Sequence, residues 1–338
     1  MLKRALLMAG VPFLLCAGSA AAAPAAGPPP LPTASNGHTV QVFASGVTTP
    51  TSFAFGAGRV FEGDAGNPPK TPGGVYVLHD GRAQRLAESP PFVAGLVWHK
   101  GTLYVSSGKF GPGGTITWQI LAWSGWKGQA FTKHRVFYTA PKDFPGFNGL
   151  AVGPDSRLYA GVSLPETGDH APAKAPFQYD ILTFGLAGKG PKVFASGIRQ
   201  PWQIAFAHGS SSPFVTDLGQ EADAKNPPDF LLHVHKGDNF GFPGCNWTVK
   251  KACRGFAKPF HLFAPHTDPG GIAIVGRTIY VSEFGMGGRP PQVVALPVKG
   301  GKARTLLSGF VAPVIGLGAH GQWLFVGSVD GNVYRVHL

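Results

Sequence analysis

Residues 193–206 read VFASGIRQPWQIAF, and residues 229–247 read DFLLHVHKGDNFGFPGCNW. The first segment contains an apolar strand, an Arg-Gln-Pro-Trp turn and a second apolar strand. The second segment adds another apolar run and a Gly/Asn/aromatic turn that ends at a cysteine. An acidic loop lies between the two segments. Parts of this arrangement recur along the chain, so the stretch is one unit of a repeat.

The repeated element is a Pro- or Gly-led turn, a short apolar strand, a Gly/Asp turn and a second strand. Each unit has room for four short strands, and no long amphipathic helix separates the units. Radial packing of four-stranded sheets buries both faces of every sheet. The sequence therefore predicts an all-β fold, a six-bladed β-propeller with four-stranded antiparallel blades. The six units open at Thr49–Phe55, Phe92–Trp98, Asn148–Val152, Gln200–Phe206, Asp268–Ile274 and Ala312–Leu317.

The last unit lacks an outer strand before the chain ends. Near the N-terminus, Val42–Gly46 reads VFASG, the same five residues as Val193–Gly197. We expect this N-terminal strand to complete the last blade, because that pairing would tie the ring and remove an exposed sheet edge.

Composition supports a folded domain. Of the 338 residues, 43% are hydrophobic and 14% are charged, which is typical of a domain with an ample core. The formal net charge of +12 is spread along the chain without a dense Lys/Arg block, and this argues against nucleic-acid binding. We interpret most of these charges as a solvated basic surface.

The N-terminus resembles an export signal. Lys3 and Arg4 precede a short apolar core, and small residues follow it, so residues 1–23 are predicted to be a signal peptide. Residues 24–37 form a Pro/Ala-rich linker, and residues 38–338 form the propeller. No later run is long enough for a transmembrane span. The expected location is periplasmic or extracellular.

Two cysteines remain after the signal peptide, Cys245 and Cys253. In an exported protein an even pair is most simply a disulfide. The loop between them is short, so the bridge should rigidify a local turn more than the whole fold.

The fourth unit has the richest set of polar loop residues. Asp217 ends a strand, and the acidic loop that follows contains Gly219, Gln220, Glu221 and Asp223. Carboxylates, amides and close glycines offer oxygen ligands to a hard cation such as calcium. A solvated acidic loop is the alternative interpretation of the same residues.

At this point the chain resembles a known family. The run GIRQPWQIAF, the acidic loop and the run GDNFGFPGCNW are similar to the pattern G-x-R-N-P-x-G-L-A-F, acidic Gly loop and G-x-N-Y-G-W-P of the soluble quinoprotein glucose/sorbosone dehydrogenases. The resemblance extends roughly from Gly146 to the C-terminus. It implies a six-bladed propeller, pyrroloquinoline quinone (PQQ) bound at the central face with calcium beneath it, and oxidation of a sugar or related alcohol. An electron acceptor would be a further partner of such an enzyme.

The resemblance also implies site residues. Arg199 matches the quinone-contacting arginine, and Gln200 stands where Asn is usual. Gly219 and Gln220 match a Gly-Pro pair whose carbonyl groups hold calcium, with Glu221 and Asp223 as nearby acids. Arg289 falls where the family has a basic cofactor contact, and a tricarboxylate quinone needs such cations.

Two departures from the family pattern concern catalysis. The family's catalytic His stands eight residues before a Gly-Pro-Asp turn, and the matching residue here is Pro145, which cannot accept a proton. The family's arginine pair before the last blade falls near Val311–Val314, where no arginine stands. The catalytic residue is therefore unknown, and His266, at the start of the fifth unit, is the substitute base that we consider.

Two alternatives stay open. Asn148 and the residues after it resemble the Asn-Gly-Leu element of gluconolactonase-type propellers, which hydrolyse lactones with a divalent metal, and Glu62 would supply an acidic ligand there. Arg199 and Gln200 replace the Asp expected in that metal site, and an arginine beside a divalent metal is electrostatically unfavourable. The other alternative is a non-catalytic propeller that binds a ligand or partner, because the family's catalytic His is missing.

Overall fold

The computed structural model describes most of the chain after the N-terminal segment. The predicted signal peptide and the first part of the linker lie outside the described residues. The described residues are 30–68, 70–79, 81–112, 115–164, 174–188, 190–221, 223, 225–285 and 287–338.

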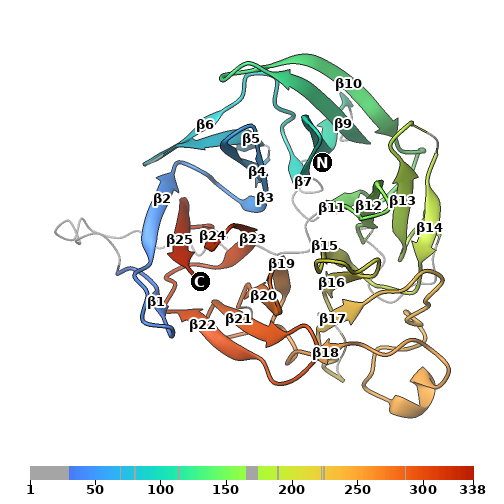
Figure 1. Cartoon of the computed structure of the whole chain (residues 1–338). Coiled ribbons are helices and arrows are strands. Elements are labelled where there is room, and N and C mark those ends of the chain that lie inside the picture. Colours follow the sequence, from blue (N-terminus) through green and yellow to red (C-terminus); the bar gives the residue numbers. More distant parts are fainter. Residues whose placement is uncertain are drawn as a thin grey trace.

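Six antiparallel sheets surround a central axis, as the repeat predicts (Figure 1). Blade one contains β3 (Pro50–Gly56), β4 (Arg59–Asn67), β5 (Thr71–His79) and β6 (Arg82–Arg85). Blade two contains β7 (Val93–His99), β8 (Thr102–Phe110), β9 (Ile116–Trp126) and β10 (Phe131–Thr139). Blade three contains β11 (Phe147–Val152), β12 (Arg157–Val162), β13 (Ile181–Gly185) and β14 (Lys192–Ala195).

The remaining blades continue the same order around the ring. Blade four contains β15 (Pro201–Phe206), β16 (Pro213–Asp217), β17 (Phe230–His233) and β18 (His261–Leu262). Blade five contains β19 (Pro269–Val275), β20 (Thr278–Glu283), β21 (Gln292–Pro297) and β22 (Arg304–Ser308). Blade six contains β23 (Val314–His320), β24 (Trp323–Ser328), β25 (Asn332–His337) and β2 (Gln41–Ser45). The first strand of each blade is innermost (Figure 1).

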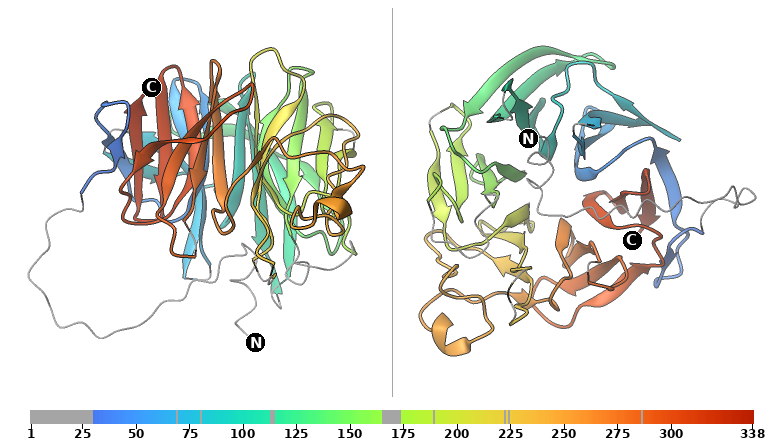
Figure 2. Two further views of the ribbon diagram at one scale, coloured as in Figure 1. Left: turned by 90° about the horizontal axis from the view of Figure 1, so that it is seen from below. Right: turned by 180° about the vertical axis from the view of Figure 1, so that it is seen from behind.

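The N-terminal strand closes the ring, which confirms the prediction from the VFASG repeat. Strand β2 pairs antiparallel with β25, with Gln41 opposite Arg335 and Ser45 opposite Asn332. Blade six is therefore built from an early and a late segment of the chain, and β2 and β25 lie side by side (Figures 1 and 2).

A short strand lies within residues 24–37, the segment predicted to be a linker. Strand β1 (Thr33–Ala34) pairs with Ser308 and Leu307 of β22 and adds a fifth strand to blade five. Ala34 is buried there. The Pro/Ala composition of the segment conceals this pairing, because two residues can add to a sheet edge without any apolar periodicity of their own.

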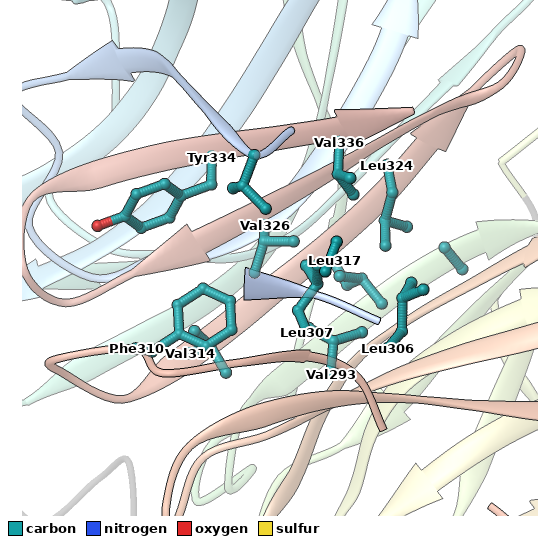
Figure 3. Close-up of a cluster of buried hydrophobic side chains, with 13 residues drawn as sticks. Val293, Leu306, Leu307, Phe310, Val314, Leu317, Leu324, Val326, Tyr334 and Val336 are labelled. Carbon is teal, nitrogen blue, oxygen red and sulfur yellow. The ribbon is translucent and has the colours of Figure 1, made fainter. Parts of the chain in front are cut away.

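The hydrophobic core consists of six clusters, and each lies between two neighbouring blades. The cluster between blades five and six is typical: Val293 and Leu307 pack against Val314, Leu317 and Val326 (Figure 3). Both faces of every blade are thereby buried, as the apolar runs in the inner strands require. Because the sheet faces are buried, binding or catalytic residues are expected in the loops at the two ends of the strands.

The disulfide prediction is confirmed. Cys245 and Cys253 are bonded, with their Cα atoms 4.9 Å apart. The 3-10 helix η3 (Lys250–Cys253) lies within the loop that the bridge closes. Within the described residues, no helix has the length and apolar character needed to cross a membrane.

Candidate functional site

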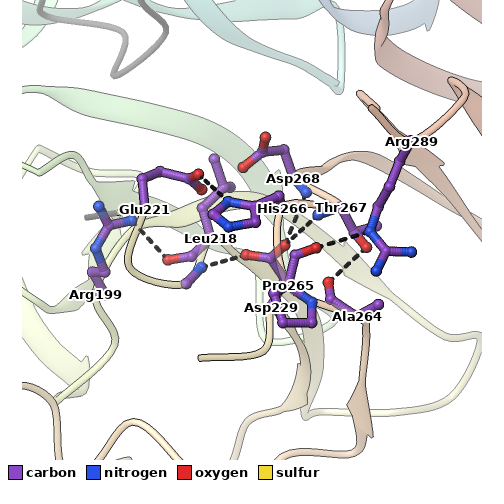
Figure 4. A network of polar contacts seen from close by, with 11 residues as sticks. Arg199, Leu218, Glu221, Asp229, Ala264, Pro265, His266, Thr267, Asp268 and Arg289 are labelled. Atoms are coloured by element: carbon purple, nitrogen blue, oxygen red, sulfur yellow. Dashed lines mark hydrogen bonds and ion pairs between the residues drawn. The ribbon is translucent and has the colours of Figure 1, made fainter. Parts of the chain in front are cut away.

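Four loops of blades four and five meet at one end of the ring. Because neighbouring strands alternate in direction, the start of each inner strand lies at the same end as the turn between the second and third strands. The loops before β15, between β16 and β17, before β19, and between β20 and β21 therefore share one face. They bring together Arg199, Glu221, His266 and Arg289 (Figure 4).

Asp229, just before β17, joins two of these loops. One carboxylate oxygen accepts a hydrogen bond from the Gly219 N–H (2.6 Å), and the other accepts from the Thr267 N–H (2.8 Å) and the Asp268 N–H (2.9 Å). Burial raises the pKa of Asp229 to about 6, and these backbone N–H groups oppose the rise. Asp229 therefore fixes the acidic loop of blade four against the start of blade five.

Asp217 likewise fixes a loop, the one that precedes β15. Its side chain is buried and accepts a hydrogen bond from the Gln200 N–H (2.7 Å). Burial raises the pKa of Asp217 to about 7, partly offset by that bond and by the charge of Arg199. The backbone that carries Arg199 and Gln200 is thus held by a carboxylate from the neighbouring strand.

Three carboxyl groups form the acidic cluster, which consists of Glu221, Asp229 and Asp268. One oxygen from each lies within 4.8 Å of the others. The pKa of Asp268 is raised, first by burial and then by the negative charges of Glu221 and Asp229. Three carboxyl groups this close repel one another when ionised. A divalent cation with oxygen ligands, such as calcium, would relieve that repulsion.

His266 lies at the edge of the acidic cluster. Its Nδ1 atom is 2.6 Å from Oε2 of Glu221, and the two side chains are 29% and 32% exposed. His266 and Asp268 both adopt left-handed backbone conformations, with φ of 58° and 50°. Such conformations cost free energy for non-glycine residues and are concentrated at functional sites. The loop between β20 and β21 approaches His266 at Gly287, where an added Cβ would lie 3.2 Å from the His266 Cβ.

The three predicted cofactor contacts differ in accessibility. Arg199 and Gln200 are 5% and 3% exposed, and Nη1 of Arg199 donates to the carbonyl oxygen of Leu218 (2.9 Å). Arg289 is exposed, and its Nε donates to the carbonyl oxygen of Pro265 (2.9 Å). Two guanidinium groups therefore flank the acidic cluster, one from each blade.

The four residues predicted to bind a metal have different contacts in the structure. Glu221 belongs to the acidic cluster, and Gly219 supports Asp229 through its backbone. The side chains of Gln220 and Asp223 instead accept hydrogen bonds from Nδ2 of Asn246, at 2.6 and 2.9 Å.

Sequence reasoning did not assign Asp229 or Asp268 to the site. Asp229 follows Pro228, and Asp268 precedes Pro269, and each aspartate stands next to a strand. A carboxylate beside a strand end was the only available signal.

Pro145, which the sequence resemblance aligns with a catalytic His, is buried in the loop before β11. Its neighbours Phe144 and Phe147 pack with ring centroids 4.5 Å apart. The position therefore belongs to the core and offers no proton acceptor.

The residues of the lactonase alternative lie in different blades. Nδ2 of Asn148, in blade three, donates to the carbonyl oxygen of Pro201 (2.9 Å). Glu62, in blade one, pairs with Phe53 on the sheet face that packs against Phe325 of blade six. Glu62 is fully buried. The Asn148 amide is thus bonded to the backbone of blade four, and the acidic group that could hold a metal ion among the described residues is Glu221, Asp229 and Asp268.

Comparison with known proteins shows similarity of fold. No family model matches the chain, and no curated protein matches its sequence. Among solved structures, an oxidoreductase (glucose dehydrogenase) from Thermus thermophilus superposes with a TM-score of 0.73 at 19% identity, over 89% of this chain and 100% of that one. The PQQ-bound aldose sugar dehydrogenase of Streptomyces coelicolor has a TM-score of 0.69 at 17% identity, over 91% and 99% of the two chains. A protein described as a gluconolactonase is less similar, with a TM-score of 0.56 at 14% identity, over 89% and 92%. The chain therefore has the six-bladed fold of the glucose and aldose sugar dehydrogenases.

Proposed function

We propose that the protein is an exported, calcium-binding dehydrogenase that oxidises a sugar or related alcohol with bound PQQ. The observation that carries this proposal is the acidic cluster between two arginines, on one face of a propeller shared with sugar dehydrogenases. Residues 1–23, as the predicted export signal, would direct the chain to the periplasm or the exterior.

The residues present fit a cation and an anionic cofactor. Glu221, Asp229 and Asp268 supply hard oxygen ligands for calcium. Arg199 and Arg289 supply positive charge for the carboxylates of a tricarboxylate quinone, with the planar guanidinium suited to paired hydrogen bonds. When bound, the quinone would supply the two-electron oxidant needed to accept a hydride from the substrate carbon.

His266 is the proposed proton acceptor in place of the residue at 145. When Nδ1–H donates to the Glu221 carboxylate, Nε2 keeps its lone pair and can accept a proton. The substrate hydroxyl loses its proton to Nε2, the C–H hydrogen leaves with its electron pair, and a carbonyl group forms. Glu221 orients the imidazole and stabilises the imidazolium, a role that carboxylates take beside histidine in other active sites.

A non-catalytic propeller is the second candidate, and buried Pro145 is the observation that favours it. In that case the acidic cluster would bind a cation without turnover. The two candidates share the cation and differ in whether substrate is oxidised.

Reconstitution of the purified mature protein tests both candidates. We expect calcium binding by titration calorimetry, a bound quinone chromophore in the presence of calcium, and dye reduction with at least one of a panel of aldoses. Binding of PQQ without dye reduction would favour the non-catalytic candidate. Absence of PQQ binding at saturating calcium would refute the quinoprotein proposal. Metal-dependent hydrolysis of a lactone panel would replace it with the lactonase alternative.

A further inference from the structure

One level of the six inner strands is unusually crowded. In each blade, one inner-strand residue pairs with the second strand at an equivalent position. These residues are Phe53, Leu96, Leu150, Ile204, Ile272 and Leu317. The crowded level consists of the residue immediately before each of them. These residues are Ser52, Gly95, Gly149, Gln203, Gly271 and Gly316. Five blades thus carry glycine or serine at this level, and blade four alone carries a long side chain.

The glycines at this level allow neighbouring blades to approach at backbone distance. A Cβ added at Gly95 would lie 2.7 Å from the carbonyl oxygen of Asn148, and one at Gly316 would lie 2.8 Å from that of Pro50. A Cβ at Gly149 would collide with Oε1 of Gln203 itself. Glycine at position 149 therefore leaves the space that the Gln203 side chain occupies.

Gln203 reaches across the ring. From blade four, its Nε2 donates to the carbonyl oxygen of Ala94 in blade two (3.0 Å) and to that of Thr51 in blade one (3.3 Å). The residue is 7% exposed. Blade one is opposite blade four in a six-bladed ring, so this amide spans the central channel.

The channel is open beyond this level. A cavity of about 410 Å³ is lined by all six inner strands, including Phe55, Trp98, Phe206 and His320. Every lining residue follows the Gln203 level along its own strand, toward the face opposite the candidate site. The cavity therefore ends at Gln203, and the candidate site lies beyond that closure.

We propose that Gln203 is a positioning residue that closes the central channel beneath the candidate site and holds the start of β15. Gln203 lies in β15, which begins directly after the predicted cofactor contacts Arg199 and Gln200. Its two N–H donors tie this strand to the far side of the ring. Its side chain also keeps the water of the channel from the floor of the site, which strengthens electrostatic interactions there. The effect of Gln203 on the candidate site rests on the proposed function. The blocking of the central channel by Gln203 does not depend on that function.

The substitution Gln203→Glu tests the donor role, because it keeps the size of the side chain and removes the N–H groups. A carboxylate facing two carbonyl oxygens is unfavourable, but a protonated carboxyl can donate one hydrogen bond. We expect the melting temperature to fall by about 5 °C at pH 8, and the deficit to shrink toward pH 5. Gln129→Glu, at an exposed position, is the control and should show no pH-dependent deficit. Equal melting temperatures for Gln203→Glu and the native protein across this pH range would overturn the donor role.

Separate measurements test whether Gln203 closes the central channel and whether it positions the start of β15. In a crystal structure of Gln203→Gly, we expect ordered water to run continuously from the 410 Å³ cavity to the face of the candidate site. A channel that stays blocked in Gln203→Gly would overturn the closure. Calcium affinity of Gln203→Glu at pH 8 should fall about tenfold, and unchanged affinity would overturn the positioning role. If the native protein binds no calcium, the proposed function fails, while the melting and crystallographic results still decide the closure.

Discussion

His266 Nδ1 lies 2.6 Å from Glu221 Oε2, and this contact joins the start of blade five to the acidic loop of blade four. Glu221 also belongs to the acidic cluster, so one carboxylate serves both the proposed cation site and the proposed base. Carboxylates that orient a histidine and support a metal are common in enzyme sites. The two roles can be separated by mutation.

Glu221→Gln should weaken calcium binding by at least tenfold, because it removes one of three clustered negative charges. Asp223→Asn is the matched control, since the Asp223 side chain lies on the same loop and bonds to Asn246 instead. Titration calorimetry measures both variants. Equal losses in the two variants would indicate that the acidic loop as a whole, and not the cluster, binds the cation.

His266→Asn should lower turnover about 100-fold while calcium affinity stays within a few fold of the native value. Asparagine tolerates the left-handed conformation that His266 adopts, so the loop should keep its path. Dye-reduction kinetics under saturating calcium measure the effect. His134→Asn, on the outer strand of blade two, is the control for loss of a histidine. Full turnover in His266→Asn would remove His266 from the mechanism.

Glu62→Val should stabilise the protein, and more so at high pH. Glu62 occupies a second-strand position at which four other blades have valine, namely Val105, Val215, Val281 and Val326. In blade one this position instead holds a fully buried carboxyl group. Burial, and then the charge of Asp64, raise the pKa of Glu62 well above its ordinary value of 4.5. Once the pH exceeds 4.5, folding must protonate this group, so native stability falls as pH rises toward the folded pKa.

Urea unfolding at pH 5 and pH 8 checks the Glu62 prediction. The gain in unfolding free energy for Glu62→Val should be about 1–3 kcal/mol at pH 8 and smaller at pH 5. Glu88→Gln, at an exposed position, should show no such gain. A pH-independent difference between Glu62→Val and the native protein would mean that ionisation of Glu62 does not contribute.

Deletion through Gly46 should open the ring. It removes β2, whose Phe43 packs against Phe325 with ring centroids 5.1 Å apart, and it exposes the edge of β25. Burial of Phe43 alone contributes about 1.5–3 kcal/mol, so we expect a large loss of melting temperature and a tendency to aggregate. Deletion through Asn36 removes β1 and keeps β2, and it should cost much less. An unchanged melting curve after deletion through Gly46 would contradict closure by this strand.

Much of the fold is determined by local patterns in the sequence. Strand periodicity and turn residues repeat within each unit, so six blades and closure by Val42–Gly46 can be predicted without a structure. The disulfide can be predicted in the same way, from an even pair of cysteines that follows a predicted export signal. Arg199 and the acidic loop can be proposed as site residues from the sequence, because they lie in one continuous stretch that resembles the quinoprotein pattern.

Only the tertiary structure decided which residues meet. Asp229 and Asp268 join Glu221 because loops from two blades converge where their strands begin and end. Gln203 reaches Thr51 and Ala94 because closure of the ring brings opposite blades within reach of one side chain. Local sequence specifies each strand and turn, since these depend on near neighbours along the chain. Contacts across the ring depend on how all six blades close, and no single segment encodes that geometry.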